Sequence, residues 1–377
     1  MYAGARGSSP AGPAADTPTH RALRRASMVS ELVAYARFAA TLPRFLHGTT
    51  TAAEARALVR ARVERRDEAF LRLARLGIFL HKRSPYRRLL DLAGCTYADL
   101  ERMVRNRGLE PALRALRDAG VYVTFDEFKG RRPIVRGAAV IPAAPRDFDN
   151  PLLARHYAAA TGGTTGAATR VLIDLDHIAA TAPLHALAWE AHGLTGAPWA
   201  LWRSILPGVS GVNNVLRGAR LGNVPRRWFT PVAPRDLAPS WRARLATAYL
   251  TAAGRAARVR IPRPEPVPIG AAGTIARWLA GTAAREGRAV LSTFVSLAAR
   301  VALAAAAEGL DLRAAAFIGG GEPPSPAKVR AITASGARFV PTYSFAEAGP
   351  VGIGCASPAD RALACPLTAV QNWPDQR

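Results

Sequence analysis

In the first third of the chain, apolar residues recur every three or four positions, which is the spacing of amphipathic helices. The pattern predicts helices over residues 29–46, 51–80, 97–105 and 110–118. Thr51 is followed three residues later by Glu54, a capping-box pattern, so we expect the second helix to begin there. These segments predict an N-terminal helical region over 29–120. Residues 1–28 lack any such period and are rich in Ala, Gly, Pro, Ser and Thr, so we expect a disordered tail.

In the last third of the chain, short apolar runs alternate with helical repeats. Strands are predicted at 289–294, 314–318 and 338–341, and helices at 274–280, 297–309 and 326–335. Such alternation is typical of a parallel sheet covered by helices, in which ligands bind at the carboxyl ends of the strands. We therefore expect an α/β core over 121–357 that begins with a strand at 121–125. An irregular C-terminal tail is expected over 358–377.

Two local features interrupt these patterns. Pro183 lies inside a helix predicted over 177–192 and capped by the stretch Asp174-Leu175-Asp176, and it should kink or split that helix. Residues 262–268 carry proline at every second position and are expected to form a stiff connector.

His185 and His192 lie seven positions apart, too far for a shared metal ion, so we interpret them as core or surface residues.

Composition narrows the class of protein. The 377 residues are 49% apolar and contain no run of about eighteen apolar residues, so we expect a cytoplasmic protein without a membrane span. The net charge of +24 raises the question of nucleic acid, but only three of the 51 basic residues are lysines and the arginines are dispersed. Dispersed arginine with abundant Ala, Gly and Pro is typical of a GC-rich genome, so we expect no nucleic-acid partner. Cys95, Cys355 and Cys365 are too widely spread to predict a disulfide framework or a zinc site.

The stretch of most unusual composition is Thr161-Gly162-Gly163-Thr164-Thr165-Gly166. Glycines allow tight turns, and successive backbone N–H groups together with threonine hydroxyls can bind one anion. The stretch lies between a short apolar segment and a strand predicted at 170–174. A P-loop needs Gly-Lys-Ser/Thr and an immediate helix, whereas Ala167-Ala168 follow here, so that interpretation is excluded.

Two predicted strand ends carry further candidate residues. One strand ends at Ile318 and is followed by Gly319-Gly320-Gly321-Glu322-Pro323, where the glycines would let a ligand approach the backbone closely. The strand at 338–341 is followed by Thr342 and then by Tyr343-Ser344-Phe345-Ala346-Glu347. The tyrosine could stack on a flat base, and the glutamate could hold Mg²⁺.

In this order and spacing, the three motifs resemble those of the adenylate-forming superfamily of acyl-CoA synthetases and AMP ligases, in particular the phenylacetate-CoA ligase branch. Residues 161–166 resemble its phosphate loop Thr-Ser-Gly-Thr-Thr-Gly, and Gly320-Gly321-Glu322-Pro323 resembles its Gly-Gly-Glu-Pro motif. Residues 343–347 resemble its Tyr-Gly-x-Thr-Glu motif, and Ser84-Pro85-Tyr86-Arg87 is similar to a Ser-Pro-Phe-Tyr-Arg stretch of the branch. The resemblance covers about residues 80–357.

The resemblance implies the fold of the large N-terminal domain of these enzymes, with mixed and parallel sheets flanked by helices, to which an N-terminal helical lobe is added. It implies that ATP activates a carboxylic acid to an acyl-adenylate (acyl-AMP) with release of pyrophosphate, and that a thiol of CoA or of a carrier protein then accepts the acyl group. The acid would lie between 185–202 and 294–296. Thr164, Thr165 and Glu347 would be catalytic, and Glu347 would bind Mg²⁺. The residues implied in nucleotide binding are Thr161, Gly162, Gly163, Gly166, Arg170, Gly320, Gly321, Glu322, Pro323, Tyr343 and Ser344.

The sequence also departs from the family pattern. The phosphate loop usually continues Lys-Pro-Lys, whereas here only Arg170 supplies a positive charge, and Ala346 replaces the threonine before Glu347. The family's C-terminal domain with its catalytic lysine would come later, so we expect a truncated form or one completed by a separate C-terminal domain protein. Two alternatives stay open. One is a degenerate homologue that binds nucleotide or acid without turnover, and the other is a basic nucleic-acid-binding protein with coincidental motifs.

Overall fold

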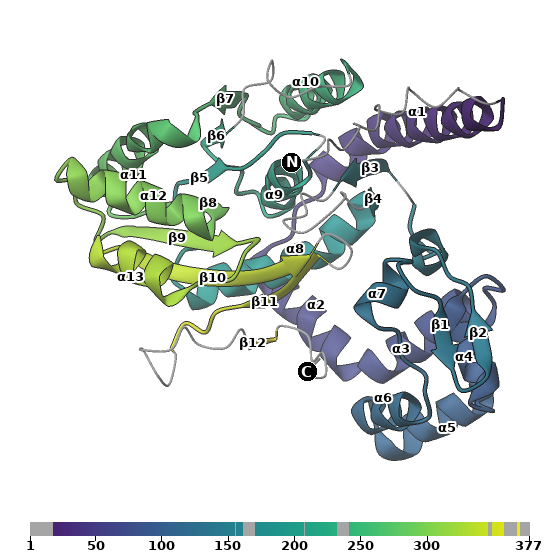
Figure 1. Cartoon of the computed structure of the whole chain (residues 1–377). Coiled ribbons are helices and arrows are strands. Elements are labelled where there is room, and N and C mark those ends of the chain that lie inside the picture. The colour runs from purple at the N-terminus through teal and green to yellow at the C-terminus, as the bar shows by residue number, and fades with distance from the viewer. Residues whose placement is uncertain are drawn as a thin grey trace, which may run out of the picture.

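The computed structural model describes residues 18–154, 156–160, 170–206, 208–231, 241–345, 349–357 and 368–369. Figure 1 shows an α/β part built on a long sheet and, beside it, a lobe of helices with a small hairpin. Residues 1–17 of the expected N-terminal tail lie outside the described residues, as does most of the expected C-terminal tail. No helix in the described part of the chain is both long and apolar enough to cross a lipid bilayer.

The α/β part is organised around an eight-stranded sheet with the order β12-β11-β10-β9-β8-β5-β6-β7. Its strands are β5 (Trp199–Trp202), β6 (Arg227–Thr230), β7 (Pro264–Pro266), β8 (Ala289–Phe294), β9 (Ala315–Gly320), β10 (Arg338–Phe345), β11 (Gly349–Ile353) and β12 (Thr368–Ala369). The strands from β5 to β10 pair in parallel, whereas β11 and β12 are antiparallel. This parallel-dominated sheet confirms the α/β class that the alternation of strands and helices predicts.

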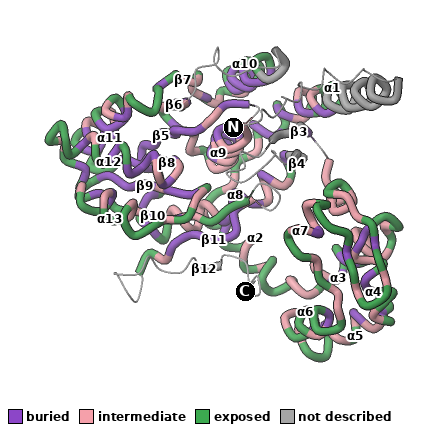
Figure 2. The backbone as a smooth tube through the Cα atoms, viewed as in Figure 1, coloured by how far each residue is buried: buried purple, intermediate pink, exposed green. Residues whose placement is uncertain are grey.

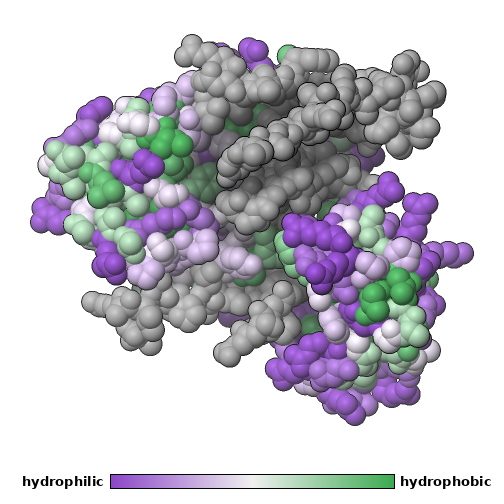
Figure 3. Space-filling model, in the orientation of Figure 1, coloured by the Kyte–Doolittle hydropathy of each residue, from purple (hydrophilic) through white to green (hydrophobic). Residues whose placement is uncertain are grey.

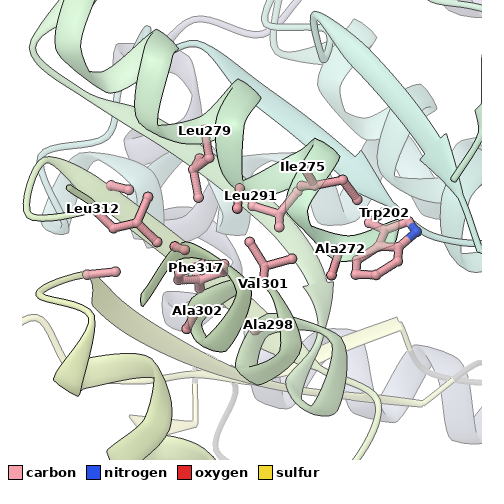
Figure 4. Packing of buried hydrophobic residues seen from close by; sticks show 14 of the residues in the cluster. Trp202, Ala272, Ile275, Leu279, Leu291, Ala298, Val301, Ala302, Leu312 and Phe317 are labelled. Atoms are coloured by element: carbon pink, nitrogen blue, oxygen red, sulfur yellow. The ribbon is translucent and has the colours of Figure 1, made fainter. Parts of the chain in front are cut away.

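Helices cover both faces of the parallel strands. On one face lie α1 (Pro18–His47), α8 (Leu175–Ala191), α9 (Ser210–Arg220) and α10 (Trp241–Ala256), and on the other lie α11 (Ala272–Glu286), α12 (Val295–Ala307) and α13 (Pro326–Ala334). Neighbouring residues of one strand serve opposite faces, since Leu201 packs in the first core and Trp202 in the second. Figure 4 shows the second core, where Leu279 and Val301 from helices lie over Leu291 and Phe317 from strands. Burial on both faces explains why these strands read as continuous apolar runs.

The strand order reverses between β5 and β8. The chain runs from β5 through β6 to β7 at one edge, then returns to β8 beside β5 and continues through β9 to β10. The helix after β5, α9, packs on one face of the sheet, and the helix after β8, α12, packs on the opposite face. The segments that leave the carboxyl ends of β5 and β8 therefore diverge. In open α/β sheets this is the position at which ligands bind.

The helical lobe has an interior of its own. It comprises α2 (Ala52–Glu64), α3 (Arg66–Ala74), a π-helical turn (Arg75–Phe79), α4 (Pro85–Leu92), α5 (Tyr97–Arg107), α6 (Leu109–Asp118), α7 (Phe125–Phe128), β1 (Ile134–Arg136) and β2 (Ala139–Ile141). One buried cluster includes Leu90 and Leu100, and a second joins Leu89 to Ile134 and Ile141. In Figure 2 the buried positions lie on the inner sides of these elements, and in Figure 3 hydrophilic side chains cover most of the visible lobe surface. Burial and surface polarity thus agree with the amphipathic pattern of the sequence.

The capping chemistry explains where several helices begin, and also one wrong prediction. Thr51 accepts a hydrogen bond from the Glu54 N–H, and the Glu54 side chain accepts one from the Thr51 N–H, which confirms the expected capping box. The strand predicted at 121–125 is wrong. Thr124 forms a capping box of the same kind with Glu127, so α7 begins at Phe125 and the preceding residues connect it to α6. A local cap outweighs the β-propensity of the apolar run there.

Proline has a milder effect than the sequence predicts. Residues 262–268 are not only a connector, because Pro264–Pro266 forms β7 at the edge of the sheet. An edge strand needs ladder hydrogen bonds on one side only, so residues without an N–H are tolerated there. An ion pair between Arg227 of β6 and Glu265 of β7 joins these two strands. Likewise α8 is not split at Pro183 but runs continuously through this buried residue.

The double-sided core gives a stability prediction. Leu279 on α11 is 0% exposed and Leu303 on α12 is 59% exposed. Leu279→Ala should lower the free energy of unfolding by about 2–5 kcal/mol, because it removes buried apolar contacts and leaves a cavity. Leu303→Ala is the matched control and should change it by less than about 0.5 kcal/mol. Urea denaturation followed by tryptophan fluorescence measures both values, and equal losses would contradict the packing described here.

A buried ion pair in the lobe gives a pH prediction. Glu127 accepts hydrogen bonds from Arg136 Nη1 (2.8 Å) and from the Thr124 N–H (2.7 Å). The bond from Arg136, aided by that from Thr124, lowers the pKa of Glu127 from 4.5 to about 2 against the effect of burial. A carboxyl group whose pKa is lower in the folded state stabilises the protein above its unfolded pKa and loses this effect as the pH falls.

We therefore expect Glu127→Gln to cost on the order of 3 kcal/mol at neutral pH. The difference from wild type should shrink as the pH falls from 4.5 towards about 2. Glu64→Gln, at an exposed position of α2, should show no such trend. Urea denaturation at a series of pH values measures the differences, and one that stays constant with pH would show that Glu127 does not titrate as proposed.

Candidate functional site

The carboxyl ends of β9 and β10 lie side by side, because these strands pair in parallel with Gly319 opposite Pro341. At Gly320, the last residue of β9, an added Cβ would lie 2.2 Å from Thr342 Oγ1 and 2.7 Å from the Thr342 carbonyl oxygen. At Gly321 φ is +83°, and an added Cβ would lie 2.7 Å from the Phe294 ring. Close approach therefore requires glycine at both positions, and the positive φ requires it again at Gly321.

Glu322 fixes the turn that follows these glycines. Its Oε1 accepts a hydrogen bond from the Ser296 N–H (2.7 Å) and a second, short one from the Ser296 hydroxyl. Its Oε2 accepts from Lys328 Nζ at 2.7 Å. Burial acts to raise the pKa of Glu322, but the bonds from Lys328 and Ser296 outweigh it and lower the pKa. The ionised carboxylate thus ties the end of β9 to the start of α12 and to α13.

Tyr343 lies at the same sheet edge. It directly follows Thr342, the residue that approaches Gly320, and it is 52% exposed. Its ring centroid is 6.0 Å from that of Phe345, at an interplanar angle of 54°. A β-bulge at Tyr343 and Ser344 shifts the pairing between β10 and β11. The tyrosine ring is therefore held beside another aromatic ring and still has surface available for stacking.

The third motif is described only at its borders. β3 (Tyr157–Ala160) and β4 (Arg170–Ile173) form an antiparallel hairpin in which Ala160 pairs with Arg170, and residues 161–169 connect them. This confirms the strand predicted at 170–174. The motif residues Thr161, Gly162, Gly163, Thr164, Thr165 and Gly166 lie outside the described residues, as does Glu347. Of the predicted site residues, those brought together at one sheet edge are Gly320, Gly321, Glu322, Pro323, Tyr343 and Ser344.

Of the two histidines, interpreted from the sequence as core or surface residues, His192 at the C-cap of α8 is buried and His185 within α8 is half-buried. His192 is 8% exposed, and its Nε2 lies 2.8 Å from the Gly354 carbonyl oxygen. His185 Nε2 is buried without a hydrogen-bond partner among the described residues. In the described part of the chain, no three His, Cys, Asp or Glu side chains are grouped so that they could hold a metal ion.

The sequence does not reveal which residues support the glycine turn, because Ser296 is expected only beside the acid and Lys328 is not singled out. Ser296 and Lys328 hold Glu322, yet neither belongs to a recognisable motif. Arg203 was also missed, although it is the single charged residue in the run 197–209, between Trp202 and Ser204. A lone arginine in an apolar strand end is a signal that could have been used, because charged residues are rarely buried without a partner.

Comparisons with known proteins add little to this geometry. No protein-family profile matches the chain, and no curated protein matches it. The chain is similar to a structure of VinN in complex with L-aspartate, with 14% identity and a TM-score of 0.34, over 65% of this chain and 46% of that one. It is also similar to wild-type E. coli MenE with a bound analogue of OSB-AMS, with 14% identity and a TM-score of 0.32, over 62% of this chain and 38% of that one. The chain thus spans less than half the length of either protein.

The close contacts of Gly320 give a prediction that distinguishes this residue from an ordinary loop glycine. Gly320→Ala should destabilise the protein by about 1–3 kcal/mol, because its Cβ would meet the backbone and side chain of Thr342. Gly270→Ala is the matched control, since a Cβ there meets nothing within 4 Å. Urea denaturation of both variants measures the difference. Equal stability of the two variants would show that β9 and β10 are not this close.

Proposed function

We propose that this chain binds ATP at the carboxyl ends of β9 and β10 and activates a carboxylic acid to an acyl-adenylate. One observation carries the proposal: Gly320 approaches Thr342 so closely that no Cβ fits, and Tyr343 comes next along β10. Glycine backbone beside a partly exposed tyrosine ring suits a flat, aromatic base such as adenine. The motif resemblance of residues 320–323 and 343–347 supports the same ligand.

The surrounding residues suit a reaction that depends on positioning. Glu322 is held by Ser296 and Lys328, so the glycine turn is fixed before a ligand binds. Transfer at phosphorus needs alignment and charge neutralisation more than covalent help from the protein, and preorganised groups provide both without reorganisation. ATP would supply the phosphorus that the carboxylate oxygen attacks, with pyrophosphate as the leaving group.

The finer parts of the proposal rest on the motif resemblance alone. They are phosphate binding by residues 161–166 with Arg170, Mg²⁺ binding by Glu347, and transfer of the acyl group to a thiol of CoA or of a carrier protein. A phenylacetate-CoA ligase-like activity and a separate C-terminal domain protein belong to the same set. Each can be tested separately from ATP binding at β9 and β10.

The experiment is an assay of pyrophosphate release with Mg-ATP and a panel of aryl and acyl acids. The wild-type chain should release pyrophosphate only when a suitable acid is present, and Glu347→Ala should abolish the release. Tyr343→Ala should raise KM for ATP by about 5-fold to 100-fold, since stacking on a base contributes about 1–3 kcal/mol. Its effect on kcat should be smaller, because the stacking contact exists before the chemical step as well.

Phe125→Ala is the matched control, because Phe125 is an exposed aromatic residue (62%) in the helical lobe. It should leave KM for ATP unchanged. Binding of ATP detected by calorimetry, without release for any acid, would identify a degenerate homologue. A wild-type chain that does not bind ATP at all would refute the proposal.

A further inference from the structure

Arg203 stands at the point where the strand order reverses. It directly follows Trp202, the last residue of β5, and its N–H donates to the Phe229 carbonyl oxygen of β6 (3.0 Å). Its side chain extends the other way, towards β8, where Nη2 donates to the Thr293 carbonyl oxygen (2.6 Å). The guanidinium carbon lies 4.8 Å from the centroid of the Phe294 ring. The arginine thus bridges the carboxyl ends of the two strands between which ligands bind in sheets of this kind.

This arginine is buried, and part of its hydrogen-bonding capacity is unused. It is 7% exposed, and its Nε has no hydrogen-bond partner among the described residues. Burial is the main cause that lowers the pKa of Arg203 to about 10, and the nearby charge of Arg217 adds to this effect. No carboxylate of the described residues acts in the opposite direction. The guanidinium therefore stays charged at neutral pH. A buried cation without a counter-ion is unfavourable unless an anion binds to it.

A second cationic side chain, that of Arg217, lies near Arg203. Arg217 belongs to α9, and its charge acts on both Arg203 and His185. Burial is the main cause that lowers the pKa of His185 well below its usual value, and the charge of Arg217 adds to it. The imidazole of His185 is therefore neutral at pH 7. The buried Nε2 of His185 has no partner in the described part of the chain. The guanidinium groups of Arg203, at the end of β5, and Arg217, on α9, thus act on one another, and their summed potential attracts an anion.

Phe294 connects this basic group to the proposed nucleotide site. The guanidinium group of Arg203 lies over one side of the Phe294 ring. The same ring would lie 2.7 Å from a Cβ added at Gly321. One side chain therefore separates Arg203 from the glycine turn beside Tyr343. A small molecule that reaches from the turn to Arg203 would span about the width of one aromatic ring and would have its far end beside the arginine.

We infer that Arg203 binds a second anionic group of the acid substrate, so that the substrate is a dicarboxylic acid. One carboxylate would be activated with ATP, and the other would accept hydrogen bonds from Arg203. This inference rests on the proposed function, which assigns the role of the first carboxylate. Guanidinium N–H groups donate parallel hydrogen bonds to a planar carboxylate. One such pair of hydrogen bonds uses both oxygens of a carboxylate, whereas a phosphate has further oxygens that would need other donors in this buried position, so a carboxylate fits better.

The test measures binding of diacids without nucleotide. Thermal unfolding of the wild-type chain is followed with malonate, succinate, glutarate or adipate, each compared with its monomethyl ester at the same concentration. At least one diacid should raise Tm by several degrees more than its ester, because only the diacid offers the second carboxylate and a ligand of the native state stabilises it. Inorganic phosphate is run in parallel and should produce no comparable shift.

Variants then assign the effect to Arg203. Arg203→Met keeps length and apolar contact but removes the charge, so the diacid-specific shift should disappear. Arg203→Lys keeps a charge without the planar fork and should weaken diacid binding at least about tenfold. Arg226→Met is the matched control, because Arg226 forms a surface ion pair with Glu286, and the shift should remain in this variant.

The outcomes separate this inference from the proposed function. Absence of a diacid-specific shift in the wild-type chain overturns the inference, whether or not Arg203→Met folds. A shift that survives in Arg203→Met, or one produced by phosphate in place of the diacids, overturns it too. If no acid supports pyrophosphate release while diacid binding depends on Arg203, only the proposed function fails. If monocarboxylic acids support pyrophosphate release equally in wild type and in Arg203→Met, the proposed function holds and only the inference of a dicarboxylic acid substrate is overturned.

Discussion

Burial of β5 and β8 on both faces is the constraint on which the rest of the α/β part depends. Leu201 and Val290 must pack against α8, α9 and α10, while Trp202 and Leu291 must pack against α11 and α12. A strand in this position cannot place polar side chains along its length without burying them. The polar residues within β8 are the small hydroxyl residues Ser292 and Thr293, both buried, and charged chemistry occurs at the strand ends, beside the glycine turn, Tyr343 and Arg203.

The strand ends form a connected and largely preset arrangement. Glu322 joins the end of β9 to α12 and α13, and Gly320 holds that end against β10. Phe294 at the end of β8 touches both the glycine turn and Arg203. Rotation of one of these groups would require movement of its neighbours, because the interior is close-packed. Such rigidity suits a site that works by positioning its ligands rather than by covalent catalysis.

The same physical principles explain where sequence reasoning failed. A run of β-branched and aromatic residues at 121–125 has strand propensity, but the capping box of Thr124 and Glu127 starts a helix at Phe125. Alternating prolines at 262–268 indicate a connector, yet an open sheet edge accepts Pro264–Pro266 as a strand. In both places the outcome depended on a partner, either a capping side chain or a neighbouring strand. Propensity alone does not contain that information.

The sequence by itself determined the α/β class, the capping box of Thr51 with Glu54, and the glycine and tyrosine motifs that belong to β9 and β10. Periodicity and turn chemistry depend on residues close together in the chain, so they can be read without a structure. Only the tertiary structure decided the reversal between β5 and β8, the contact of Arg203 with Thr293 across 90 positions, and that of Glu322 with Ser296 across 26. Those contacts follow from strand pairing and two-sided burial, which are properties of the whole folded chain and of no local segment.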